Sequence, residues 1–305
     1  MARYIAPVRT LRDVLVDAER RLENAGVPSP RVDAELLLAH VLDVPRGRLL
    51  MSDPADPSDV SRFEPLLMKR AARTPLQHLL GEAPFRHLTL AVGRGVFVPR
   101  PETESVAELA IRALREAPEG TRLAVDLCTG SGAIALALAT EVPGSVVHAV
   151  ELDEVAAGWA RRNVQENAGA ITAAGSIVEL HVGDATRAHL ESLVDLVGRF
   201  DVVVTNPPYI PDDAVPRDPE VARHDPPRAL FGGPDGLDVV RGLAVVAAAL
   251  LRPGGVLVVE HGDEQGERAG AAGVPHVLRE HGGFTEVDDH VDLGGRDRAT
   301  TARSV

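Results

Sequence analysis

Apolar residues recur at helical spacing through the first eighty residues of the chain. Leu11, Leu15 and Leu22 lie on one face of a predicted helix. Thr10 and Asp13 stand three residues apart at its start, which is typical of a capping box. The pattern therefore predicts a first helix that begins after Thr10 and ends near Gly26.

Two more helices and a change of period follow. Pro30 favours the first turn of a second helix that runs to about Leu42, and a third is predicted over residues 58–73. Over residues 85–98 apolar and polar positions alternate instead, which predicts a β-hairpin. We therefore predict a helical domain over residues 1–80, a hairpin linker over 81–100 and a second domain over 101–305.

From residue 100 onwards, apolar strands alternate with helical segments. Strands are expected over residues 123–127, 146–151, 177–182, 200–205 and 255–260, and helices over 102–115, 132–141, 154–167 and 237–251. The last two strands, over 285–291 and 298–303, have no helix between them and predict an antiparallel pair at one edge. The pattern is typical of an α/β fold with a mostly parallel, doubly wound sheet. Residues 207–234 are proline-rich and lack periodicity, which predicts a functional or mobile loop.

Composition narrows the class of protein. With 45% apolar and 25% charged residues, the chain can bury a sizeable core. No apolar run approaches the roughly 18 residues that span a bilayer, and no secretion signal is visible, so no membrane partner is expected. Cys128 is the only cysteine, which argues for a cytoplasmic location and against a structural metal site. A net charge of −13 disfavours nonspecific binding to nucleic acid.

A glycine-rich turn follows the first strand of the second domain. The turn spans residues 128–132 and leads into a helix, and Glu151 ends the next strand. Small residues let a ligand approach a helix N-terminus, and a carboxylate at that place can accept both ribose hydroxyls. These residues alone do not separate a nicotinamide dinucleotide from S-adenosylmethionine, and a tight turn beside a solvated acid remains an alternative. Asp184 after the third strand fits either an adenine contact or a helix cap.

The fourth strand runs into Asn206, Pro207, Pro208 and Tyr209. Two successive prolines remove backbone donors, so the carbonyl groups of Asn206 and Pro207 are predicted to be free acceptors at the edge of the sheet. Two acceptors can orient a planar amide or aryl amine so that its nitrogen lone pair points at an electrophilic methyl group. Tyr209 can stack on such a flat substrate, which makes this segment the predicted acceptor site.

Five segments together resemble a known family. They are residues 74–82 (TPLQHLLGE), 98–104 (VPRPETE), 125–136 (VDLCTGSGAIAL), 206–210 (NPPYI) and 227–238 (PRALFGGPDGLD). The chain resembles class I S-adenosylmethionine-dependent methyltransferases, and within them the protein-(glutamine-N5) methyltransferases that modify peptide chain release factors. The resemblance covers nearly the whole chain. NPPY alone is shared with adenine-N6 methyltransferases, whereas segments 98–104 and 227–238 are more specific.

The resemblance implies a fold, a reaction and a site. The fold would be a Rossmann-like sheet with an antiparallel edge strand and a small N-terminal helical bundle that recognises the substrate. The enzyme would transfer methyl from S-adenosylmethionine to a glutamine of class 1 peptide chain release factors, in their Gly-Gly-Gln motif, leaving S-adenosylhomocysteine. The implied cofactor residues are Cys128, Thr129, Gly130, Ser131, Gly132, Glu151, Asp184, Ala185 and Asn206, and the implied catalytic and substrate residues are Asn206, Pro207, Pro208 and Tyr209.

Some positions depart from the family pattern, and other functions remain open. Cys128 replaces the more usual glycine, which is tolerable if this residue has a negative φ. Glu151 replaces the commoner aspartate, and Ala185 is small for stacking on adenine. The alternatives are an adenine-N6 nucleic-acid methyltransferase, a ribosomal-protein glutamine methyltransferase, a nicotinamide-dependent dehydrogenase and an inactive scaffold.

Overall fold

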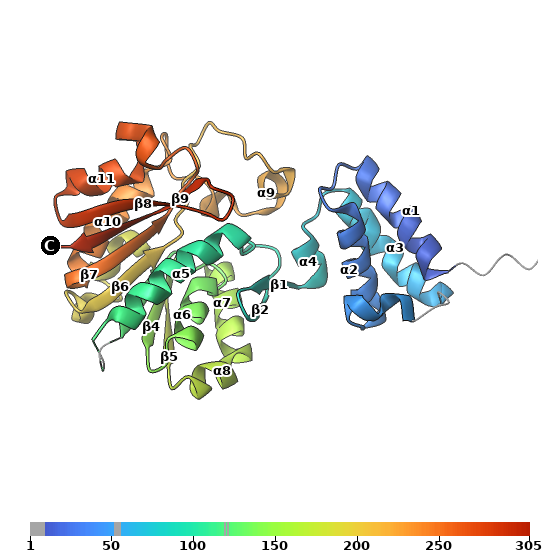
Figure 1. Ribbon diagram of the computed structural model, residues 1–305, viewed down its shortest axis with the longest axis horizontal. Coiled ribbons are helices and arrows are strands. Elements are labelled where there is room, and N and C mark those ends of the chain that lie inside the picture. Colours follow the sequence, from blue (N-terminus) through green and yellow to red (C-terminus); the bar gives the residue numbers. More distant parts are fainter. Residues whose placement is uncertain (1–9, 52–55, 119, 121) are drawn as a thin grey trace, which may run out of the picture. The chain divides into compact units, whose positions relative to one another are not determined.

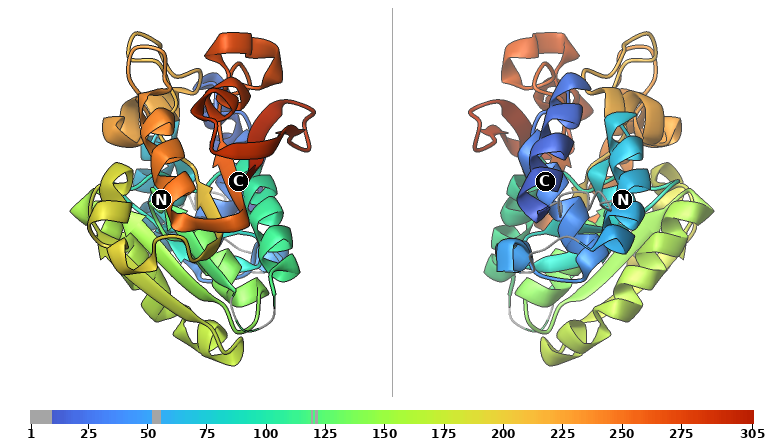
Figure 2. Two further views of the ribbon diagram at one scale, coloured as in Figure 1. Left: turned by 90° about the vertical axis from the view of Figure 1, so that its left-hand side faces the viewer. Right: turned by 90° about the vertical axis from the view of Figure 1, so that its right-hand side faces the viewer.

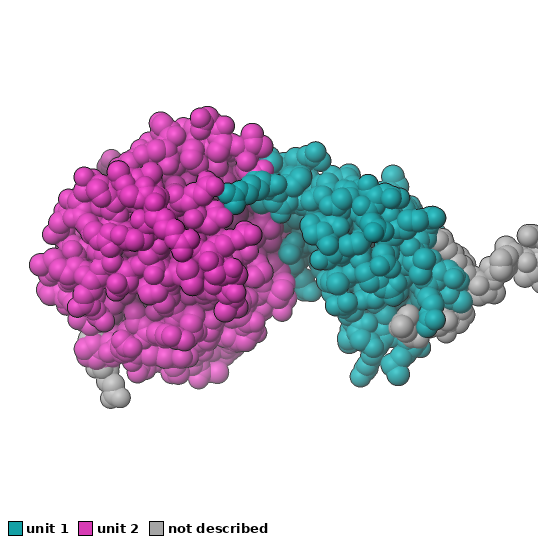
Figure 3. All heavy atoms as spheres, turned by 45° about the horizontal axis from the view of Figure 1, so that its top comes forward, with its two compact units in different colours: residues 1–82, 217–224 teal, residues 83–216, 225–305 magenta. Residues whose placement is uncertain are grey.

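The chain forms two compact units in the computed structural model, which describes residues 10–51, 56–118, 120 and 122–305. Unit 1 comprises residues 1–82 and 217–224, and unit 2 comprises residues 83–216 and 225–305, as coloured in Figure 3. Across the described ranges, no helix is both long and apolar enough to cross a membrane.

Unit 1 is a helical bundle. Its elements are α1 (Leu11–Asn24), α2 (Pro30–Leu42), the 3₁₀ helix η1 (Arg46–Met51), α3 (Pro57–Ala71), α4 (Leu76–Leu80) and α9 (Pro219–His224) (Figure 1). The predicted capping box is confirmed, because Thr10 Oγ1 accepts from Asp13 N at 3.1 Å and Asp13 Oδ2 accepts from Thr10 N at 3.0 Å. Leucines of α1 and α2 join Phe63 and Leu67 of α3 in one buried core.

The proline-rich stretch supplies part of this bundle. Residues 217–224 belong to unit 1, although the residues before and after them belong to unit 2. Within unit 1, Glu220 contacts Arg70 of α3 and Arg73, which follows the end of that helix. Arg70 donates to Asp33 and to Glu220, each at 2.7 Å, and Arg73 Nε donates to Glu220 at 2.7 Å. Burial raises the pKa of Glu220, but hydrogen bonds led by Arg73 outweigh it and hold that pKa well below its usual range. This part of the proline-rich stretch is therefore an ordered helical segment of unit 1.

Unit 2 contains a small hairpin and a large sheet with helices. The hairpin begins at the unit boundary and joins β1 (Glu82–Phe85) and β2 (Leu88–Ala91). The sheet strands are β3 (Leu123–Leu127), β4 (Val146–Glu151), β5 (Ile177–Val182), β6 (Phe200–Thr205), β7 (Leu251–Glu260), β8 (Phe284–Val291) and β9 (Asp297–Ser304). The helices are α5 (Pro101–Glu116), α6 (Ala133–Glu141), α7 (Glu154–Glu166), α8 (Ala168–Ala173), α10 (Asp238–Leu250) and α11 (Val274–His281), with 3₁₀ helices η2 (Ala185–Leu190), η3 (Val194–Leu196), η4 (Pro227–Ala229) and η5 (Glu267–Ala272).

The sheet has the order β5-β4-β3-β6-β7-β9-β8. The first five strands in this order, from β5 to β7, are all parallel to one another. Strand β9 pairs antiparallel with both β7 and β8. One buried core joins α5, α6 and α8 to one face of the sheet, and another joins η2, α10 and α11 to the other face, so helices cover both sides (Figure 2). The predicted Rossmann-like fold with an antiparallel edge is confirmed.

The predicted extent of the hairpin was wrong. Its strands end at Ala91, and residues 96–98 form no strand although Val96 and Val98 are fully buried. These valines pack with Ala83, Val92 and Ala156 in a small core of their own. Their apolar pattern therefore reflects burial against α7 and not strand pairing.

Candidate active site

The carboxyl ends of four adjacent parallel strands carry all the predicted site residues. The glycine-rich turn follows β3, Glu151 ends β4, Asp184 and Ala185 follow β5, and Asn206 follows β6. Strand β3 lies between β4 and β6, so the chain order reverses at this point of the sheet. In open α/β sheets, ligands bind in the crevice at such a switch point.

Cys128 in the glycine-rich turn has a positive φ. Its φ is 67°, so the condition of a negative φ, under which a side chain would be tolerated here, is not met. A side chain in this left-handed region costs roughly 1–2 kcal/mol. Backbone hydrogen bonds from Thr129 N to Val150 O (3.0 Å) and from Gly132 N to Thr129 O (2.9 Å) hold the turn. Burial raises the pKa of the Cys128 thiol, which disfavours a thiolate nucleophile here.

Glu151 lies against the glycine-rich turn. Its Oε2 accepts from Gly130 N at 2.8 Å and its Oε1 accepts from Asp153 N at 2.9 Å. Burial raises the pKa of Glu151, and these two backbone bonds partly offset that shift. Gly130 has a φ of 58°, and a Cβ placed there would have no atom within 4 Å. The turn thus offers open backbone beside a carboxylate, which fits a nucleoside ligand.

Asp126 and Asn163 make this turn rigid. Asp126 Oδ2 accepts from Thr129 Oγ1 at 2.5 Å and from Ala135 N at 3.1 Å, which ties the end of β3 to the first turn of α6. Asn163 Nδ2 donates to Ser131 O at 2.9 Å. Thr129 and Ser131 are both buried, so they shape the turn from inside.

Asp184 caps the 3₁₀ helix η2. Its Oδ1 accepts from Thr186 N at 2.9 Å and from Thr186 Oγ1 at 2.7 Å. The structure thus shows the capping alternative, and an adenine contact by the same carboxylate stays a prediction. Ala185 is 5% exposed and belongs to the core beneath α10, so it offers little surface for stacking.

The acceptor motif is held at the end of β6. Thr205 Oγ1 donates to Leu127 O at 2.6 Å, which locks β6 to β3 just before Asn206. Asn206 Nδ2 donates to Thr103 Oγ1 at 3.3 Å, and Pro207 is buried. Burial raises the pKa of Tyr209, so its phenol stays protonated at neutral pH.

Glycines of segment 227–238 support the back of the acceptor motif. A Cβ at Gly232 would stand 2.4 Å from Pro208 O, and one at Gly236 would stand 2.2 Å from Tyr209 O. Gly232 N also donates to Ile210 O at 2.9 Å. Only a residue without a side chain permits such close backbone approach, which explains the glycines in this segment.

Two residues beside the acceptor motif were not predicted to be functional. Thr103, in the first turn of α5, contacts Asn206, and Glu260, at the end of β7, is fully buried next to both. Thr103 belongs to segment 98–104, which carried only the family resemblance. Glu260 was seen only as the last residue of a strand, and no spacing rule links it to Asn206.

A histidine cluster on β4 and β5 was not predicted either. His148 Nδ1 lies 2.9 Å from His181 Nε2, and with Glu179 these residues offer three possible metal ligands within 4.8 Å of one another. The mutual hydrogen bond satisfies one nitrogen of each ring, and burial lowers the pKa of both histidines. The cluster is therefore stable as a neutral histidine pair.

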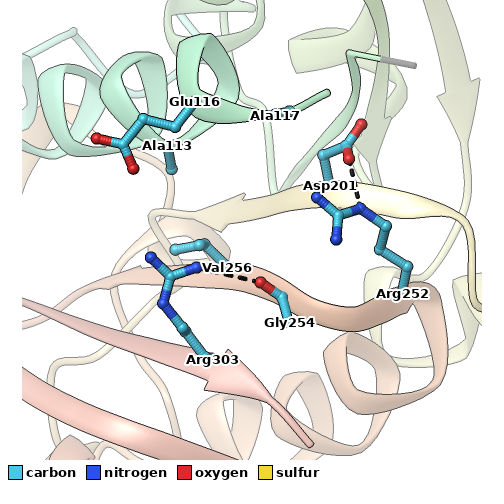
Figure 4. A pocket seen from close by; sticks show the side chains of 8 residues that line it. All are labelled: Ala113, Glu116, Ala117, Asp201, Arg252, Gly254, Val256 and Arg303. Atoms are coloured by element: carbon cyan, nitrogen blue, oxygen red, sulfur yellow. Dashed lines mark hydrogen bonds and ion pairs between the residues drawn. The ribbon is translucent and has the colours of Figure 1, made fainter. Parts of the chain in front are cut away.

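A pocket of about 200 Å³ lies at the other end of the sheet (Figure 4). It is lined by Asp201 at the start of β6, by Arg252 and Gly254 of β7, and by the C-terminal end of α5. Arg252 donates to Asp201 at 2.6 Å and Arg303 donates to Gly254 O at 3.2 Å, so both arginines have partners inside the pocket. None of the predicted site residues lines this pocket.

Comparisons with known proteins identify the family of this chain. Residues 13–81 match the PrmC N-terminal domain, and residues 87–218 match the methyltransferase small domain. A release factor glutamine methyltransferase of Streptomyces coelicolor is 51% identical over 95% of this chain and 96% of its own. A release factor glutamine methyltransferase of Mycolicibacterium smegmatis is 48% identical over 97% of this chain and 98% of its own length. Among solved structures, a release factor-specific protein-(glutamine-N5) methyltransferase of Alicyclobacillus acidocaldarius is 28% identical, and the match covers 70% of this chain and 98% of that chain with a TM-score of 0.40.

Proposed function

The chain belongs to the family of release factor glutamine methyltransferases, and from this premise we propose that it methylates a glutamine in class 1 peptide chain release factors. The methyl donor is S-adenosylmethionine, and the products are N5-methylglutamine in the Gly-Gly-Gln motif and S-adenosylhomocysteine. The observation that carries this proposal is the rigid acceptor motif after β6, placed beside the open turn and carboxylate after β3 and β4.

The donor side of the site would be formed by residues 128–132 and Glu151. Bound S-adenosylmethionine supplies an electrophilic methyl group on a sulfonium centre. The exposed backbone at Gly130 would lie along its methionine part, and the Glu151 carboxylate would accept from the ribose hydroxyls. Asp184 and Ala185 would flank the adenine. Charge-assisted hydrogen bonds to the ribose are the strong contacts in this arrangement.

The acceptor side would be formed by Asn206 to Tyr209. The Asn206 side-chain oxygen and the Pro207 carbonyl would accept the two N–H groups of the substrate amide. An amide nitrogen is a poor nucleophile because its lone pair is delocalised, so it has to be turned until that lone pair faces the methyl. Alignment of this kind can contribute roughly 7–11 kcal/mol to lowering a barrier. The N–H proton becomes acidic only as the new C–N bond forms, so water can remove it.

The proposal also assigns a role to the helical unit and a cellular location to the enzyme. Unit 1 would recognise the folded release factor, since it forms its own core separate from the sheet. The enzyme would act in the cytoplasm, where release factors work. The net charge of −13 supports a protein acceptor and no direct contact with nucleic acid.

A panel of acceptors tests this function. Purified enzyme with radiolabelled S-adenosylmethionine would be given a class 1 release factor, ribosomal proteins and an adenine-containing oligonucleotide in parallel. We expect label on the release factor, located at one glutamine by mass spectrometry. Label on the oligonucleotide alone would favour adenine-N6 methylation, and label on a ribosomal protein alone would assign a different protein acceptor.

A further inference from the structure

Glu260 is buried at the end of β7, beside the acceptor motif. Strands β6 and β7 pair in parallel with Thr205 opposite Val259, so the next residues, Asn206 and Glu260, lie side by side. Glu260 is 2% exposed, and its Oε2 has no hydrogen-bond partner within the described part of the chain. A buried carboxyl with an unpartnered oxygen is costly, and such exceptions are expected at functional sites.

Thr103 and Glu260 surround the amide nitrogen of Asn206. Asn206 Nδ2 donates to Thr103 Oγ1 at 3.3 Å, and the Thr103 and Asn206 side chains favour the charged form of the Glu260 carboxyl, which lowers its pKa against the effect of burial. An ionised carboxylate can only accept, and an amide nitrogen can only donate. Thr103 Oγ1 and the neighbouring Glu260 carboxylate are therefore the acceptors that favour the Asn206 nitrogen on this side, and the Asn206 Oδ1 is left for another donor.

The proposed function uses that same oxygen, and this inference rests on it. We propose that Glu260 is a positioning residue that, with Thr103, fixes Asn206 in the orientation whose Oδ1 accepts from the substrate amide. In the flipped orientation, the Asn206 nitrogen would meet the substrate N–H groups, donor against donor. The substrate amide would then lose an acceptor in a buried site and its alignment with the methyl.

The ionisation of Glu260 gives this arrangement a pH dependence. Burial raises the pKa of Glu260 to about 7, helped by the charge of Glu102 on α5 and opposed by Arg298 on β9. The Tyr209 phenol also faces it and stays neutral. A protonated carboxyl carries an O–H that can donate to Asn206 Oδ1 and so favours the flipped amide. The kcat should therefore rise as the pH increases through about 7.

Glu260→Gln tests the role with little change in shape. The Gln amide can donate to Asn206 Oδ1, so both orientations of Asn206 become available. We expect kcat to fall about 10- to 100-fold and the rise near neutral pH to disappear, while the Kd of S-adenosylmethionine changes less than about threefold. The control Glu102→Gln removes an exposed neighbouring charge. It should keep the plateau kcat and move the rise to lower pH.

A swap of groups separates positioning from a structural role. In Asn206→Asp two carboxylates face each other, whereas in Asn206→Asp with Glu260→Gln the new amide can donate to the new carboxylate. We expect the double variant to be about tenfold more active than Asn206→Asp alone. Thermal unfolding of each variant shows whether it is folded. A double variant no better than Asn206→Asp would contradict the proposal.

The same assays distinguish a failure of the positioning role from a failure of the proposed glutamine methylation. A wild-type enzyme that labels no glutamine overturns the proposed function. A wild-type enzyme that labels glutamine, with Glu260→Gln matching its kcat and pH profile, overturns the positioning role alone.

Discussion

Gly232→Ala places a methyl group against the backbone of the acceptor motif. The new Cβ would stand 2.4 Å from Pro208 O and 2.7 Å from Gly236 O, whereas ordinary contacts begin at 3.4 Å. Neither neighbour is a flexible side chain, so backbone has to move by roughly 1 Å. Because the φ of Gly232 is not positive, the substitution adds no backbone strain of its own.

The effect on catalysis should exceed the effect on folding. Overpacking of this kind costs about 1–3 kcal/mol of stability. A 1 Å displacement of Pro208 moves the neighbouring acceptors at Asn206 and Pro207, and misplacement of that size can cost about 100-fold in rate. We therefore expect kcat for a release factor to fall about 10- to 100-fold. The Kd of S-adenosylmethionine should hardly change, because the turn after β3 is untouched.

A matched control is available on α8. Gly169 is exposed, and a Cβ there would have no atom within 4 Å, so Gly169→Ala should keep kcat and change stability by less than about 1 kcal/mol. Both variants would be assayed at a temperature where unfolding curves show them folded. A folded Gly232→Ala enzyme with wild-type kcat would refute the view that this glycine sets the position of the acceptor motif.

Further substitutions test the cofactor side and the helical unit. Glu151→Ala should weaken S-adenosylmethionine binding by about 1.5–3 kcal/mol in calorimetry, and unchanged affinity would remove Glu151 from the site. Glu220→Gln should lower the free energy of unfolding of the helical unit by about 3–5 kcal/mol, because the buried Arg70 and the partly buried Arg73 lose a charged partner. Since the folded pKa of Glu220 is lowered, its contribution to stability is present above its unfolded value of 4.5 and is progressively lost as the pH falls below that value. Denaturant titrations of both proteins check this: the two unfolding curves should differ at neutral pH and approach each other in acid, and equal curves at neutral pH would contradict it. Cys128→Gly should change stability by less than about 1 kcal/mol, because relief of the positive φ offsets the added chain entropy, and a larger loss would show that the thiol matters for packing.

The sheet was predictable because buried parallel strands are short apolar runs between turn residues. The strand predicted over residues 177–182 is β5, residue for residue, and the capped helix after Thr10 is α1. Such signals lie within a few neighbouring residues. The same is true of the turn after β3 and of the motif after β6, which the fold brings to adjacent strand ends.

Contacts between distant residues were not predictable in this way. Helix α9 is six residues long, too short for a periodic pattern, and Glu220 meets Arg70 across 150 residues of sequence. Glu260 becomes a partner of Asn206 only because β7 pairs with β6. The positive φ of Cys128 is imposed by the turn around it, against the preference of its own side chain.

Methylation by the Asn206→Ala enzyme tests the central claim most directly. The substitution removes the acceptor for one N–H of the substrate amide, which costs about 1–3 kcal/mol before any misalignment is counted. With a class 1 release factor and radiolabelled S-adenosylmethionine, we expect kcat to fall at least about 100-fold, cofactor affinity to change much less, and Asn206→Asp to retain partial activity. If folded Asn206→Ala labels the release factor glutamine at near wild-type rate, the motif only ends a strand and the assigned acceptor site is wrong.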